Sequence, residues 1–248
     1  MNSAFYFIKK QLKQLIERVL PAQCLLCGLP SHNKLICPYC QKEMLQARVC
    51  CQYCGLSLTN SQLFCGDCVK QKHLFTKLHA LASYQPPYPT LIKQLKYEHK
   101  LISGELLGQL LADSIASHFS GDQITGFDYL IAVPLHSKKL RQRGFNQAQL
   151  IADIVSRQLK IPLLANSVKR NKETQAQEGL SISKRRKNLR AAFTANKNSP
   201  LQGKHIALLD DVVTTGATID SLCHCLLAEK VSSITVFCIC RTDPHHHL

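Results

Sequence analysis

The sequence lacks any apolar run approaching the ~18–20 residues that a membrane-spanning helix needs. Its apolar start, residues 4–8, is too short for a secretory signal and leads directly into Lys9, Lys10 and Lys13. Tryptophan is absent, and aromatic residues make up only 6% of the chain. These absences predict a soluble cytoplasmic protein with few rings available to enclose a planar ligand.

Acidic residues are scarce: 16 Asp and Glu oppose 31 Lys and Arg among 248 residues, which gives a formal net charge of +15. Fourteen of the basic residues lie between Lys138 and Arg190, where only three acids occur. A concentrated positive field attracts polyanions such as nucleic acid or phosphorylated ligands. Solvated helix faces are the other interpretation of such a run, and the sequence leaves both open.

Residues 1–20 are predicted to form a basic amphipathic helix. Apolar side chains recur there at three- and four-residue spacing, with basic side chains off that stripe. Pro21 ends the pattern. Such a helix can pack on its own protein, or it can rest on the inner face of an anionic membrane.

The thirteen cysteines do not have the arrangement of a disulfide-rich protein. Eight of them form four C-x-x-C pairs within the first 70 residues, which is metal-binding spacing in a reducing compartment. Redox dithiols are the alternative, but the βαβ context that they need is missing. Four others lie in apolar surroundings and are expected to be buried thiols: Cys223, Cys225, Cys238 and Cys240.

The four pairs belong to an internal repeat within residues 21–75. Each unit reads C-x-x-C-G-L, then seven or eight residues, then a second C-x-x-C. Four thiolates close a tetrahedral structural zinc site and leave no position for a catalytic water. The sequence therefore predicts two structural zinc ions, although crossed pairing between the units stays open. In chain order the ligand sets are Cys24, Cys27, Cys37 and Cys40, and Cys51, Cys54, Cys65 and Cys68.

Over residues 76–248, apolar strands alternate with helices. Strands are predicted at 79–84, 129–134, 163–168, 205–209 and 233–240, and helices at 90–97, 101–119, 145–159 and 217–229. Residues 169–190 are expected to form a mobile basic loop followed by a short helix. The alternation predicts an α/β fold with a mostly parallel sheet flanked by helices, and ligands at the carboxyl ends of the strands.

Residues 205–218, HIALLDDVVTTGAT, combine an apolar strand, two acids and a polar loop that opens a helix. Free amides at a helix start and the helix dipole favour an anion. Threonine hydroxyls and a glycine complete a phosphate cradle, for which the candidates are Thr214, Thr215, Gly216, Ala217 and Thr218. Asp210 and Asp211, expected at the end of the strand, would accept hydrogen bonds from sugar hydroxyls and bias a Mg²⁺ position. An acid-terminated strand before an ordinary helix is the alternative.

A second polar segment, residues 134–148, follows the strand that ends at Pro134. It places four cations beside the expected ligand edge, where they would meet a second anion: Lys138, Lys139, Arg141 and Arg143. Asn146 begins the next helix and is a further candidate contact. A solvated basic turn is the alternative interpretation.

The stretch 205–218 resembles the 5-phosphoribosyl-1-pyrophosphate (PRPP) motif of type I phosphoribosyltransferases at all fourteen positions. In that family the acids hold the ribose hydroxyls and the loop holds the 5′-phosphate. The whole chain resembles the ComF family, competence-associated proteins in which a zinc module precedes a phosphoribosyltransferase-like domain. This resemblance rests on the four C-x-x-C pairs, the PRPP motif and residues 91–97 (LIKQLKY), 143–147 (RGFNQ), 172–177 (KETQAQ) and 186–193.

The resemblance implies a role with single-stranded DNA in natural transformation, with other competence proteins as partners and zinc and PRPP with Mg²⁺ as ligands. The DNA-binding track would then join the cations of residues 138–143 to a second basic run: Lys184, Arg185, Arg186 and Lys187. Three functions stay open, namely a DNA-uptake factor that binds a phosphoribosyl ligand, an active phosphoribosyltransferase and a zinc-dependent adaptor. We favour the first, because no base-recognition element can be identified in the sequence.

Overall fold

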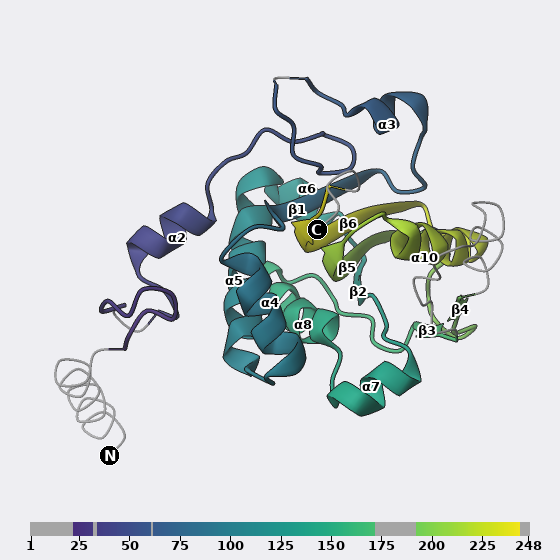
Figure 1. Ribbon diagram of the computed structural model, residues 1–248. Helices are drawn as coiled ribbons and strands as arrows, with labels where there is room; N and C mark the ends of the chain where they lie inside the picture. Colours follow the sequence, from purple (N-terminus) through teal and green to yellow (C-terminus); the bar gives the residue numbers. More distant parts are fainter. Residues whose placement is uncertain (1–21, 32–33, 61, 172–191, 244–248) are drawn as a thin grey trace, which may run out of the picture. The chain divides into compact units, whose positions relative to one another are not determined.

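A computed structural model of the protein describes residues 22–31, 34–60, 62–171 and 192–243. The chain divides into two compact units, the first ending at Ala47 and the second beginning at Arg48 (Figure 1). The predicted helix over 1–20 lies outside the described residues, as do Lys184, Arg185, Arg186 and Lys187. Within the described ranges, no helix is both long and apolar enough to span a bilayer.

The second unit is built on a four-stranded parallel sheet with the order β1-β6-β5-β2. Its strands are β1 Lys77–Ser83, β2 Tyr129–Ala132, β5 His205–Val213 and β6 Ser233–Arg241. The two central strands pair over their full length, from His205 opposite Ser233 to Val213 opposite Arg241. They are nearly continuous apolar runs, as expected of parallel strands covered on both faces. The predicted α/β fold is confirmed.

Helices cover both faces of this sheet (Figure 1). On one face α5 packs on β1 and β6, α8 packs on β2 and β5, and α4 packs on α5. On the other face α10 packs against the β3–β4 hairpin, and both join the buried cluster under the sheet. The bounds are α4 Tyr88–Tyr97, α5 Leu101–His118, α8 Gln147–Leu159, α10 Ala217–Ala228, β3 Val168–Arg170 and β4 Phe193–Ala195.

Four local features differ from the sequence prediction. The expected strand at 163–168 pairs with β2 only around Leu130, because Asn166 turns the chain with a φ of 57°. Its last residues instead start the antiparallel hairpin of β3 and β4. The expected basic turn contains helix α7, Ser137–Arg143, a run of good helix formers, and a short helix α6 spans Gly121–Thr125. Strand β5 continues past both acids to Val213.

The two cysteine repeats belong to different units. The first unit contains α2, Pro38–Met44, and a bridge between Gln23 and Pro30. The second repeat, with α3 Gly66–Lys70, lies in the unit of the sheet. Its Tyr53 carbonyl accepts a hydrogen bond from the Leu78 amide of β1 at 2.8 Å, and Arg48 donates to the Ala80 carbonyl at 2.7 Å. The predicted boundaries at residues 20 and 75 stay predictions, while compactness divides the chain after Ala47.

Two glycines at equivalent repeat positions test how closely the second repeat rests on the sheet. Both have positive φ, +72° at Gly28 and +67° at Gly55. A Cβ on Gly55 would lie 2.9 Å from Leu78 Cδ2, whereas one on Gly28 would meet nothing within 4 Å. We expect Gly55→Ala to cost about 2–4 kcal/mol through backbone strain plus overpacking, which lowers the unfolding midpoint of the second unit by roughly 5–15 °C.

The measurement is differential scanning calorimetry of the zinc-loaded protein. Gly28→Ala is the matched control, because it carries the same backbone strain without the contact and lies in the first unit. It should leave the midpoint of the second unit unchanged. Equal midpoints for the two variants would contradict the docking of the second repeat on β1.

Candidate functional site

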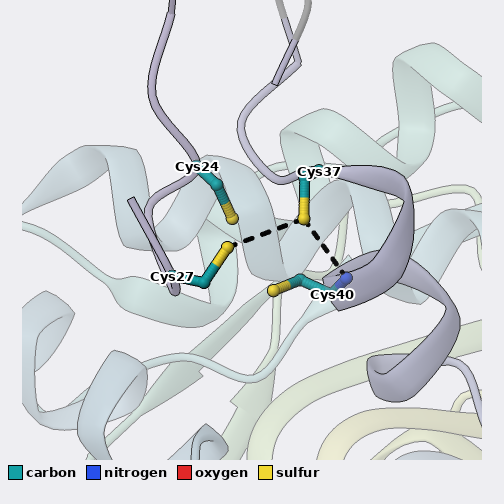
Figure 2. Close-up of side chains that lie close together, drawn as sticks. All are labelled: Cys24, Cys27, Cys37 and Cys40. Carbon is teal, nitrogen blue, oxygen red and sulfur yellow. Dashed lines mark hydrogen bonds between the residues drawn. The ribbon is translucent and has the colours of Figure 1, made fainter. Parts of the chain in front are cut away.

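The eight paired cysteines gather into two groups of four, in chain order rather than crossed. Within each group the sulfur atoms lie within 4.8 Å of one another. The Sγ atoms of Cys27 and Cys37, which point toward each other in Figure 2, are 3.7 Å apart. Those of Cys54 and Cys65 are 3.6 Å apart. A tetrahedral zinc with bonds of about 2.3 Å requires sulfur pairs about 3.8 Å apart. Each tetrad therefore fits one zinc ion.

The local backbone explains this grouping. In each repeat a tight turn closes the first pair, with the Gly28 amide donating to the Cys24 carbonyl and the Gly55 amide to the Cys51 carbonyl, both at 2.9 Å. The second pair begins a short helix, where Cys37 caps α2 and accepts from the Cys40 amide at 3.5 Å. Backbone donors directed at sulfur favour the thiolate form, which is the form that binds metal.

The charge state of the thiols follows from burial and these donors. Burial opposes ionisation of the first thiol in each tetrad, but backbone N–H groups outweigh it and lower the pKa of Cys24 to about 6 and of Cys51 to about 7. Burial raises the pKa of Cys54 to about 12. A divalent cation bound among the sulfurs would favour the thiolate at all four positions.

His73 is an additional polar group at the second tetrad. Its Nε2 lies 3.3 Å from the Sγ of Cys68, and its ring stacks on Phe75 with centroids 4.6 Å apart. Phe75 belongs to the buried cluster under the sheet. An imidazole N–H in this position would hydrogen-bond the sulfur and connect the metal site to the core.

The phosphate cradle predicted from the sequence begins α10. Gly216 is the N-cap, with a φ of +83° that favours glycine, and it offers no side chain to cap the helix. Thr214 and Thr215 are exposed, and the Thr215 hydroxyl accepts from the Ala217 amide at 3.4 Å. The first-turn amides of α10 therefore face a polar, exposed loop where an anion can accept from them.

Arg241, at the end of β6, anchors the start of the loop that follows β5. This buried guanidinium donates to the carbonyls of Val213 at 3.1 Å and Thr242 at 2.9 Å, and also to that of Thr214. The Thr242 amide donates back to Val213 at 3.0 Å. These contacts fix the path of the chain between the acids and the cradle.

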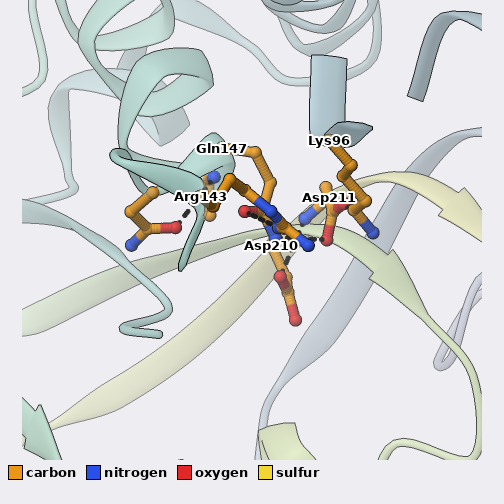
Figure 3. Close-up of polar contacts among 7 residues, drawn as sticks. Lys96, Arg143, Gln147, Asp210 and Asp211 are labelled. Carbon is orange, nitrogen blue, oxygen red and sulfur yellow. Dashed lines mark hydrogen bonds and ion pairs between the residues drawn. The ribbon is translucent and has the colours of Figure 1, made fainter. Parts of the chain in front are cut away.

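Asp210 and Asp211 lie side by side on β5 but point to opposite faces of the sheet, because strand side chains alternate (Figure 3). Asp211 is buried and faces the helices. It forms an ion pair with Lys96 of α4 and accepts a hydrogen bond from Gln147 of α8 at 3.5 Å. Asp210 is partly exposed and accepts from the Asp211 amide at 2.9 Å.

The surroundings of Asp210 disfavour its charged form. Desolvation and the neighbouring Asp211 raise the pKa of Asp210 well above its ordinary value, despite the opposing effect of Lys96. Burial opposes the charge of Lys96, but the carboxylate of Asp211 raises its pKa, so the ammonium stays charged. Asp210 can donate as well as accept when protonated, which suits contact with a sugar hydroxyl.

The basic segment divides between the site and the surface. Arg143, at the end of α7, donates to Gln147, which in turn bonds Asp211 (Figure 3). Asn146 caps α8 by accepting from the Ala148 amide at 3.1 Å, and its Nδ2 donates to the Val133 carbonyl at 3.0 Å. The remaining predicted cations are exposed on α7: Lys138, Lys139 and Arg141.

Sequence reasoning missed Lys96, Gln147, Arg241 and His73 as individual site residues. Lys96 and Gln147 lie within the segments LIKQLKY and RGFNQ that carry the family resemblance. The sequence therefore marked these segments but did not indicate what the two side chains contact. Arg241 ends an apolar strand, and a charge at the carboxyl end of a parallel strand is a usable indication. The only indication of a role for His73 in the sequence was its position close after Cys68.

Comparisons with known proteins agree with this layout. A double zinc ribbon domain model matches residues 15–69, and a phosphoribosyl transferase domain model matches residues 146–247. DNA utilization protein YhgH of Escherichia coli (strain K12) is 34% identical over 227 residues, which cover 90% of this chain and 98% of that protein. Competence protein F of Haemophilus influenzae is 34% identical over 207 residues, covering 83% and 90%.

More distant matches extend the series. Competence protein ComFC of Bacillus subtilis is 24% identical over 239 residues, covering 96% of this chain and 83% of that protein. Among solved structures, a purine phosphoribosyltransferase of Pyrococcus horikoshii aligns with 57% of this chain and 83% of its own, at 15% identity and a TM-score of 0.34. That last similarity is too low to bear on activity.

The zinc content of two variants tests the metal sites. The metal-replete protein should contain two zinc ions, and Cys27→Ser and Cys54→Ser should each remove one. Because the second repeat contacts β1 at Leu78, Cys54→Ser should also lower the unfolding midpoint of the second unit, whereas Cys27→Ser should not. Elemental analysis and calorimetry measure the two effects. Less than one zinc per parent chain, or equal midpoints for both variants, would contradict the assignment.

Proposed function

Because the chain belongs to the ComF family, which includes the DNA utilization and competence proteins described above, we propose that it handles single-stranded DNA and binds a phosphoribosyl ligand such as PRPP or a nucleotide 5′-phosphate. The observation that supports this most directly is one edge of the sheet. There the acids of β5, the loop of residues 214–218 and the cations following β2 converge in space. No other edge in the described part of the chain combines these three groups.

The loop is the proposed phosphate subsite. Thr215 and Thr218 supply hydroxyl donors, and the α10 amides supply dipole-aligned donors. Gly216 has a positive φ, and nothing lies within 4 Å of where its Cβ would be. The loop is therefore open to a ligand at this position. Ionised phosphate oxygens accept hydrogen bonds and cannot donate them, so a cradle of donors matches them.

The acid pair is the proposed ribose subsite. Asp210 is partly exposed and has the raised pKa of a group that can share a proton with a hydroxyl. Asp211 is already engaged by Lys96 and Gln147, so it holds the arrangement rather than binding freely. A Mg²⁺ ion would find only one uncommitted carboxylate here, and we therefore expect it to arrive on the pyrophosphate of PRPP.

The exposed cations of α7 are the proposed start of the DNA track. Lys139 and Arg141 are exposed, and phosphodiester contacts with such side chains are independent of base sequence. The basic residues 184–187 would extend the track. Cysteines that serve as zinc ligands rather than disulfides suit a reducing compartment, so we place the protein in the cytoplasm.

An active phosphoribosyltransferase is the second candidate, favoured by the complete PRPP motif and its acid pair. Incubation with PRPP and a panel of nucleobases separates the two, because only the enzyme releases pyrophosphate. An adaptor without a DNA role would show neither turnover nor salt-sensitive DNA binding.

PRPP binding tests the ribose subsite. At about pH 9, above the raised pKa of Asp210, Asp210→Asn removes a carboxylate and leaves the contact between Lys96 and Asp211. We expect it to weaken PRPP·Mg²⁺ binding roughly 10- to 100-fold, since a charged hydrogen bond is worth about 1.5–3 kcal/mol. Thr215→Ala should act in the same direction but less. Isothermal titration calorimetry measures both. Asp122→Asn, an exposed acid of α6, is the control, and an Asp210→Asn variant that binds like the parent would refute the subsite.

Single-stranded DNA binding tests the track. Counterion release predicts a log–log salt slope near −0.7 per neutralised phosphate, hence about −2 to −4 for three to five contacts. Lys139→Ala with Arg141→Ala should make the slope shallower by roughly 1 to 1.5. Fluorescence anisotropy with a short 5′-phosphorylated strand measures it, and PRPP should displace that strand.

Lys197→Ala with Lys230→Ala is the charge-matched control. Both lysines are exposed, and Lys230 follows the carboxyl end of α10, away from the cradle. This pair should leave the slope as it is in the parent. Equal slopes for the two double variants, together with DNA binding that is unaffected by saturating PRPP, would exclude the track.

A further inference from the structure

An exposed tyrosine lies at the margin of the acid pair. Tyr97 ends α4 and directly follows Lys96, whose ammonium is paired with Asp211. Its side chain is 71% exposed. Large apolar side chains with comparable exposure elsewhere in the described ranges are Tyr39 and Val69, and neither is next to a residue that contacts the acids. Most of this ring is therefore open to solvent, next in the chain to a residue that contacts the acid pair.

Arg143 connects this ring to the site. Its guanidinium carbon lies 5.6 Å from the Tyr97 ring centroid, and the same guanidinium donates to Gln147, the partner of Asp211. The ring, the guanidinium and the acid are thus joined in a closed chain of contacts through α4, α7, α8 and β5. An arginine over an aromatic face forms a cation–π pair that orients both groups.

A second aromatic pair lies two residues further along the same two segments. His99 and Phe145 have ring centroids 5.8 Å apart and meet edge to face. His99 lies two residues after Tyr97, and Phe145 lies two residues after Arg143. The two segments therefore contact each other twice, once through Tyr97 and Arg143 and once through His99 and Phe145. His99 is exposed and Phe145 is half-buried. The result is a small aromatic surface, Tyr97, His99 and Phe145, beside the network of Arg143, Gln147 and Asp211.

We infer that this aromatic surface is a stacking site for the nucleobase of the nucleotide whose phosphate and ribose occupy the cradle and the acid pair. The inference rests on the proposed function. The contacts support it, because they connect the exposed ring through Arg143 and Gln147 to Asp211, the neighbour of Asp210 on β5. Stacking on tyrosine does not depend on base identity, since every base has a π-face, which suits single-stranded DNA of any sequence.

The test compares ligands with and without a base. Binding of a nucleoside 5′-monophosphate and of ribose 5-phosphate is measured by calorimetry on the full zinc-loaded chain. Tyr97→Leu should weaken the nucleoside monophosphate roughly 5- to 100-fold, the range found when a stacking aromatic is removed, and should leave ribose 5-phosphate unchanged. Tyr97→Phe should retain nucleotide affinity, because the ring is kept. Tyr39→Leu, an equally exposed tyrosine of the first unit, should have no effect on either ligand.

The outcomes separate this inference from the proposed function. If Tyr97→Leu binds both ligands like the parent, the stacking site is wrong while the phosphoribosyl site stands. If Tyr97→Leu weakens both ligands equally, Tyr97 supports the ribose subsite and reads no base, which also overturns the inference. If the parent binds neither ligand, the proposed function itself fails and the inference fails with it.

Discussion

The parallel pairing of β5 between β2 and β6 is the constraint on which the site depends. Because all three strands run in the same direction, their carboxyl ends meet at one edge and bring together segments from residues 134, 210 and 241. Alternation along β5 then sends Asp211 toward α4 and α8 and Asp210 toward the opposite face. A shift of one residue in this register would exchange the two acids and bury the wrong one.

The ion pair between Lys96 and Asp211 follows from that register. Burying two charges costs desolvation free energy that their attraction only partly offsets, so such a pair is weak evidence for stability. The pair is better explained by the elements that it holds together. Lys96 connects α4 to Asp211 of β5, and Gln147 connects α8 to the same carboxylate. Arg143 extends this network to α7. The polar network therefore fixes three helices around the ligand edge, and this fixes Tyr97 as well.

The fold could be predicted from the sequence where physical signals are local. The C-x-x-C-G-L repeats, the apolar runs of β5 and β6 and the Thr/Gly loop each determine their own geometry. What the sequence could not show depends on tertiary contacts. Lys96 reads as one more surface cation of a basic chain until α4 packs beside β5, and the hairpin of β3 and β4 joins segments separated by residues 172–191. The aromatic surface was missed for the same reason, since the composition gives the number of aromatic residues but not which of them lie close together in the fold.

The two ribbons show how one repeat can be stabilised in two ways. A module of this size buries too little apolar surface to fold alone, so four thiolates around a metal supply the missing free energy. In the first unit the repeat leaves Leu25, Leu29 and Tyr39 exposed and depends on its metal. In the second, Tyr53 and Phe75 enter the buried cluster under the sheet, and His73 links that cluster to Cys68. The second metal site is therefore an extension of the core that supports β1, while the same cysteine pattern in the first unit belongs to a separate compact unit. Sequence identity between repeats thus specifies the metal geometry, but the surrounding contacts decide what each metal stabilises.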